Sequence, residues 1–107
     1  MKGQSVLLLD LRKLTVITDF FVICSSGSVT GVKAIAEEIL GRFKKDGTPP
    51  NHVEGLAEGD WVLIDYGDAI VHVFHEQARE FFDLESLWGD APQRSFGPTP
   101  RKQKVGK

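Results

Sequence analysis

Residues 60–74, DWVLIDYGDAIVHVF, decide the fold of this chain. Two apolar runs flank Gly67 and Asp68, and such a pair between apolar runs predicts a tight turn that joins two antiparallel strands. Trp61 opens the first strand beside a charged residue, and His72 interrupts the second. The stretch therefore predicts a hairpin that is mostly apolar but carries several polar side chains.

Upstream of the hairpin, the pattern predicts two strands, a long helix and a brief edge strand. The strands are expected over residues 6–11 and 20–24, and the edge strand over residues 52–55. Apolar residues at helical spacing over residues 29–43 predict a helix that Ser28 caps, that ends near Lys44 and Lys45, and that Gly47 terminates.

Downstream of the hairpin, residues 76–82 predict a short helix with Ala78, Phe81 and Phe82 facing inward. Residues 84–88 are shifted in phase, which predicts a kink near Asp83. From Gly89 onward, the proline, glycine and lysine content predicts an unstructured tail. The fold class is thus α/β (α+β), with a mixed sheet of about five strands and helices packed on it. The domain is expected to span residues 1–88 and the flexible basic tail residues 89–107.

Length and composition set the broad class. A chain of 107 residues with 41% hydrophobic and 26% charged residues is typical of one soluble domain. Its apolar runs are too short to cross a bilayer, and its first residues are not a signal peptide. Cys24 is the single cysteine, which excludes an intrachain disulfide and fits a reducing cytoplasm.

The net charge of −2 is unevenly distributed. Residues 89–107 hold five basic residues and one acid, whereas residues 1–88 hold eight basic residues and 14 acids. An acidic body favours a basic partner surface, and a basic tail can contact phosphates. Solubility and a disordered tail would explain the same charges.

Catalytic interpretations each lack a required residue. Cys24 precedes a loop and a helix, but Thr30 stands where a phosphatase loop needs an arginine to hold phosphate. The loop from Ser26 to Gly31 is similar to the glycine–serine element of nucleotidyltransferases, which pair it with two carboxylates at alternate strand positions. Asp65 and Asp68 are three residues apart, so they do not supply that pair.

Metal and cofactor sites are not expected. His72 and His75 are three residues apart and would diverge on a continuous strand. The sequence contains no phosphate-binding loop with lysine and no dinucleotide fingerprint. We therefore predict no cofactor and no metal.

The chain resembles the ribosomal silencing factor family, also called Iojap or RsfS. The matching residues run from Asp10 to Trp88 and cover roughly residues 5–88. They are Asp10, Thr18, Asp19, Phe20, Phe21, Val22, Ile23, Cys24, Gly27, Ser28, Ala34, Ile35, Ala36, Glu54, Gly55, Trp61, Val62, Leu63, Ile64, Asp65, Gly67, Asp68, Val71, His72, Val73, Phe74, Arg79, Phe81, Phe82, Asp83, Leu84, Glu85, Leu87 and Trp88.

The resemblance implies a protein that is not an enzyme. Members of this family bind the large ribosomal subunit through its protein L-fourteen, obstruct joining of the small subunit, and damp translation when nutrients are short. Their fold is similar to the nucleotidyltransferase fold without its catalytic acids, and they often form homodimers. The family usually has a further helix ahead of the first strand, which would cover apolar surface, whereas this chain starts almost at that strand. The lack of a transit peptide favours a bacterial, cytoplasmic protein. Two other classes stay open: a small nucleotide-binding transferase that uses the loop from Ser26 to Gly31, and a dimeric adaptor.

The binding residues are expected on one face of the hairpin. Side chains of a strand alternate between its faces, so Val62 and Ile64 form the better core candidate. The opposite face presents Trp61, Leu63 and Asp65, and an aromatic group beside a carboxylate suits a contact with a basic ribosomal protein. Trp61 could instead pack under a helix, and a tryptophan at a helix end is more often a core cap than a contact. Further candidate contacts are Glu54, Asp60, His72, Glu76, Arg79 and Trp88.

Overall fold

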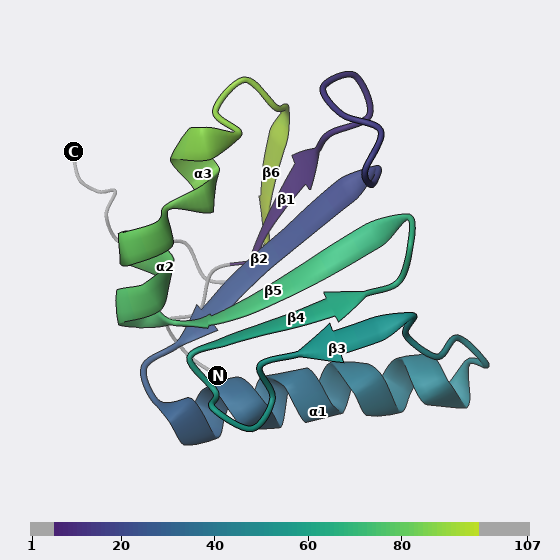
Figure 1. Ribbon diagram of the computed structural model, residues 1–107, viewed down its shortest axis with the longest axis vertical. Helices are drawn as coiled ribbons and strands as arrows, with labels where there is room; N and C mark the ends of the chain where they lie inside the picture. The colour runs from purple at the N-terminus through teal and green to yellow at the C-terminus, as the bar shows by residue number, and fades with distance from the viewer. Residues whose placement is uncertain (1–5, 97–107) are drawn as a thin grey trace.

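The structure, a computed structural model, describes residues 6–96. Its centre is a six-stranded mixed sheet with strand order β3-β4-β5-β2-β1-β6 (Figure 1). β2 and β5 are parallel, and every other neighbouring pair is antiparallel. The strands are β1 (Val6–Asp10), β2 (Phe20–Ser26), β3 (His52–Glu54), β4 (Trp61–Asp65), β5 (Ala69–His75) and β6 (Gln93–Phe96). The sheet is mixed, as predicted.

The predicted hairpin is formed by β4 and β5. Gly67 adopts φ +87°, a conformation that side-chain-bearing residues rarely adopt. The Tyr66 N–H donates to the Ala69 carbonyl at 2.9 Å, and the Gly67 N–H donates to Asp65 Oδ1 at 2.7 Å. The turn glycine and the carboxylate before it thus fix the register in which Trp61 lies opposite Phe74.

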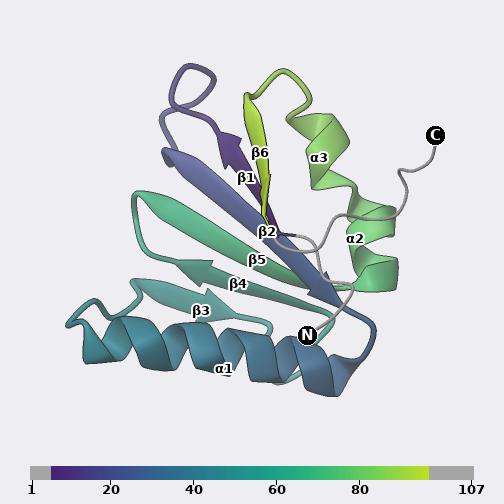
Figure 2. The same ribbon diagram turned by 180° about the vertical axis from the view of Figure 1, so that it is seen from behind.

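One face of the sheet is covered by α1 (Val29–Lys45) (Figures 1 and 2). Ser28 caps this helix as predicted, because its Oγ accepts the Gly31 N–H at 2.9 Å. Val32 and Ala36 are fully buried against this face. The strand residues beneath them are Cys24, Val62, Ile64, Val71 and Val73. The expectation that Val62 and Ile64 form the core is confirmed.

The other face is covered in part by two short helices, α2 (Glu76–Phe82) and α3 (Leu84–Leu87). Asp83 separates them in the left-handed conformation, with φ 49°, which is the predicted kink. The prediction that Phe81 faces inward is wrong, since Phe81 is 81% exposed. Phe82 is 47% exposed and packs against Trp61 of β4, and Ala78 also packs on this face of the sheet. Two adjacent residues point in different directions on a helix, so Phe81 and Phe82 do not share one environment.

A sixth strand corrects the predicted boundary of the tail. β6 pairs with β1, and the Asp10 N–H donates to the Pro92 carbonyl at 2.9 Å. Ala91 is buried, at 5% exposure. The sheet therefore extends past Gly89 to Phe96, which the expected count of five strands did not include. The rest of the predicted tail, residues 97–107, lies outside the described residues.

Candidate docking site

Four of the predicted contact residues share the sheet face that α2 and α3 leave partly open. The register places Leu63 between Glu54 and His72, and Trp61 and Asp65 flank Leu63 on the same strand. Alternation puts all five side chains on one side. The pattern of the hairpin thus predicts the shared face of Trp61 and Asp65 correctly.

Trp61 is partly buried at the centre of an aromatic cluster. Its ring centroid lies 4.9 Å from that of Phe74 and 4.7 Å from that of Phe82. Its Nε1–H donates to His72 Nδ1 at 3.0 Å. Trp61 therefore packs under α2, as the alternative interpretation has it, and keeps part of its ring accessible.

His72 lies beneath this surface, at 3% exposure. Burial among aromatic rings lowers the pKa of His72 to about 4, because the charged imidazolium loses its hydration. Since Nδ1 accepts from Trp61, the proton of the neutral ring is on Nε2, and that buried nitrogen has no hydrogen-bond partner among the described residues. The structure thus places His72 as a support for Trp61.

The predicted acidic contact residues differ in their burial and in their hydrogen bonds. Asp65 is partly buried and caps the turn through Gly67, whereas Asp60 is exposed just before β4. Glu54 is also exposed and lies 2.6 Å from His52 Nε2 on the edge strand. Glu54 and Asp65 lie on the same sheet face as Trp61 and Leu63, and Asp60 directly precedes Trp61.

Arg79 and Trp88 have structural partners. The Arg79 guanidinium donates to Glu85 Oε2 and to Ser25 Oγ, each at 2.9 Å, and so ties α2 to α3 and to β2. Trp88 packs edge-to-face on Phe21 at 5.9 Å. Both side chains hold α2 and α3 against the sheet.

The Glu76 side chain lies next to the loop from Ser26 to Gly31, which the transferase interpretation uses. A Cβ placed on Gly27 would lie 3.7 Å from Glu76 Oε1, so the Glu76 carboxylate lies over the loop. Ser26 is buried against Gly31, and Ser28 Oγ already accepts the Gly31 N–H. A carboxylate in this position repels phosphate.

The cysteine nearby is poorly suited to nucleophilic chemistry. Burial raises the pKa of the Cys24 thiol to about 11, which keeps it protonated at neutral pH. Among residues 6–96, no three His, Cys, Asp or Glu side chains lie together in a way that could hold a metal ion. The helices described are not long and apolar enough to cross a membrane.

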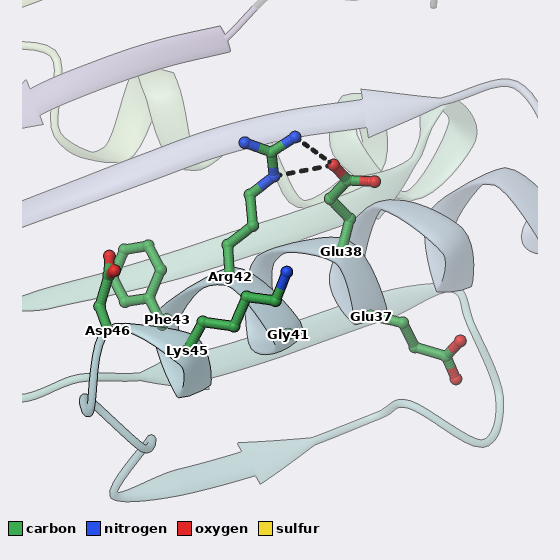
Figure 3. Close-up of a pocket in the computed structure, with 7 residues that line it drawn as sticks. All are labelled: Glu37, Glu38, Gly41, Arg42, Phe43, Lys45 and Asp46. Atoms are coloured by element: carbon green, nitrogen blue, oxygen red, sulfur yellow. Dashed lines mark hydrogen bonds and ion pairs between the residues drawn. The ribbon is translucent and has the colours of Figure 1, made fainter.

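A hollow of about 740 Å³ lies along α1 (Figure 3). Its lining side chains are all exposed, and Arg42 forms an ion pair with Glu38 at 2.8 Å, as the dashed lines show. The sheet lies between α1 and the face that carries Trp61. This hollow brings together none of the predicted contact residues.

Charge is concentrated around the hairpin and the helices that follow it. Residues 51–91 contain one basic residue, Arg79, and ten acids. The acids are Glu54, Glu58, Asp60, Asp65, Asp68, Glu76, Glu80, Asp83, Glu85 and Asp90. Such a surface attracts a positively charged partner.

The structure defines an α/β domain with an acidic, partly aromatic face on one side of a mixed sheet. The chain belongs to the ribosomal silencing factor family, since the family described as "Ribosomal silencing factor during starvation" matches residues 1–107. The chain is 42% identical to the ribosomal silencing factor RsfS of Bacillus subtilis over 91 residues, which are 85% of this chain and 77% of that protein.

Structural and more distant similarity agree with this assignment. The crystal structure of protein CV0518 from Chromobacterium violaceum matches with a TM-score of 0.77 and 34% identity, over 91% of this chain and 80% of that one. The mouse "Mitochondrial assembly of ribosomal large subunit protein 1" is 31% identical over 74 residues, or 66% of this chain and 32% of that protein.

Proposed function

We propose that this protein binds the large ribosomal subunit through protein L-fourteen and blocks association with the small subunit, so that translation is repressed when nutrients are limiting. The names of the relatives support a ribosomal role, and the mouse relative is named for the large subunit. The observation that carries the proposal is the acidic face of the hairpin with the partly exposed Trp61 at its centre.

The mechanism is steric and needs no chemical step. A protein that covers the joining surface of one subunit must bind tightly and occupy space. Trp61 supplies apolar area at the centre of the contact, and Asp65 meets a lysine or arginine at its rim. Glu54 and Asp60 extend the acidic rim on either side.

The remaining parts of the proposal concern location and assembly. We place the protein in the bacterial cytoplasm, as its bacterial relatives suggest. A homodimer, and a weak contact between the basic tail and ribosomal RNA, are further proposals. No observation favours the nucleotide transferase, because the Glu76 carboxylate lies over its loop.

Cosedimentation with separated subunits tests the partner and the face together. The wild-type chain should sediment with large subunits and not with small ones. Asp65→Asn keeps an oxygen that accepts the Gly67 N–H but removes the charge, so affinity should fall roughly fivefold while folding is retained. Glu37→Gln, on the solvent face of α1, is the matched charge control and should bind as wild type does. Equal affinity of all three proteins would place the contact elsewhere.

A further inference from the structure

A hollow of about 310 Å³ lies between α2 and the start of β4. Its lining residues are Asp60, His75, Gln77, Ala78, Phe81 and Phe82. It adjoins the hairpin face, because the Phe82 ring contacts the Trp61 ring at 4.7 Å between centroids. The hollow therefore continues the docking site from the sheet onto the helix.

The exposure of Phe81 has no explanation in folding. Its side chain is 81% exposed, and its ring packs edge-to-face on Phe82 at 5.0 Å. Phe81, Phe82 and Trp61 thus form a continuous row of three rings, of which the outermost stands in solvent. An exposed aromatic row bordered by charge is typical of an interaction surface.

The chemistry of the hollow selects a cation. Aromatic faces attract lysine and arginine side chains, and the Asp60 carboxylate at the edge of the hollow would pair with the charged end. His75 is already engaged, since its Nδ1 accepts the Gln77 N–H at 3.2 Å. Glu80 on α2 and Asp83 just after it add negative charge, while Arg79 is turned toward Glu85 and Ser25.

We infer that Asp60, Phe81 and Phe82 form an anchor site for one lysine or arginine side chain of the partner. The stem of that side chain packs on the two rings, and its charged end meets Asp60. This inference rests on the proposed function, because it takes the same partner, a basic protein of the large subunit. It adds a second anchor, on α2, to the contact made by the hairpin face.

Affinity for purified large subunits, measured beside thermal unfolding, tests the site. Phe81→Ala should bind about tenfold more weakly, since truncating an anchoring aromatic residue costs at least that much. Its melting temperature should match that of wild type, because the ring is largely exposed. Asp60→Asn should weaken binding as well, and the double variant should lose less than the two single losses combined, because both side chains hold the same group. Phe43→Ala is the matched control: Phe43 lies on α1, is 40% exposed, and should leave affinity unchanged.

Each other outcome overturns the inference in a distinct way. If wild type binds large subunits and Phe81→Ala binds equally well, the site on α2 is wrong and the proposed function stands. A loss with Phe81→Ala but none with Asp60→Asn means that the hollow takes an apolar group. A change in self-association alone, detected by sedimentation equilibrium, means that a second copy of this chain occupies it. If wild type does not bind large subunits, the proposed function and this inference fail together.

Discussion

Acidification from pH 7 to pH 4.5 should weaken the fold through His72. Burial lowers the pKa of His72 to about 4 in the folded state, against 6.5 for an ordinary histidine. Between these values the unfolded chain binds a proton that the folded chain does not, so stability is complete above pH 6.5 and declines as the pH falls toward 4. Protonation would also place a hydrogen on Nδ1, which accepts from Trp61.

The size of the loss follows from the two pKa values. Each pKa unit corresponds to about 1.4 kcal/mol of folding stability. At pH 4.5 most of the difference between the two pKa values contributes, so the free energy of unfolding falls by about 2 kcal/mol. For a domain of this size, that loss lowers the melting temperature by roughly 10 °C. The surrounding Phe21, Phe74 and Trp61 rings offer no charge that would offset it.

The assay is thermal or urea unfolding of wild type and His72→Phe at both pH values. The phenylalanine ring has a similar shape and cannot titrate, so the variant should lose about 2 kcal/mol less than wild type on acidification. Carboxylates that titrate near pH 4.5 affect both proteins alike and cancel in the difference. Equal losses in the two proteins, or an NMR titration of His72 with a midpoint near 6.5 in the folded protein, would refute the reasoning.

Two further predictions concern α1 and catalysis. Gly31→Ala should destabilise the fold by roughly 1–3 kcal/mol, because the new Cβ would collide with Ser26 Oγ. Gly41→Ala meets open space and should stabilise the helix by about 0.5–1 kcal/mol. Urea unfolding measures both changes, and a stabilised Gly31→Ala would contradict the close packing of Gly31 on Ser26. The protein should release no pyrophosphate from nucleoside triphosphates with magnesium, because Glu76 lies over the loop from Ser26 to Gly31. If wild type releases pyrophosphate and Asp65→Ala does not, the transferase is supported instead.

Local signals explain which elements the sequence predicts well. Gly67 and Ser28 each determine a turn or a helix end within a few residues, and both elements form where expected. β6 carries no such signal. Its side chains, Gln93 to Phe96, are all exposed, and backbone pairing with β1 holds it, so its residues show no pattern of alternating burial.

The candidate site depends more on contacts distant in sequence. Alternation along one strand predicts that Trp61 and Asp65 share a face. The burial of His72 depends instead on rings from three strands, and the role of Arg79 depends on Ser25, 54 residues away. The exposure of Phe81 could not be inferred from a seven-residue helix, because so short a segment defines its apolar face poorly.

We propose that the protein, once bound to the large subunit, keeps the two ribosomal subunits apart. Light scattering during mixing of purified large and small subunits measures their joining directly. We predict that preincubation of large subunits with this protein slows and reduces the rise in scattering in proportion to occupancy, and that Asp65→Asn requires a higher concentration for the same effect. Normal joining at a concentration that saturates the large subunits would contradict the account.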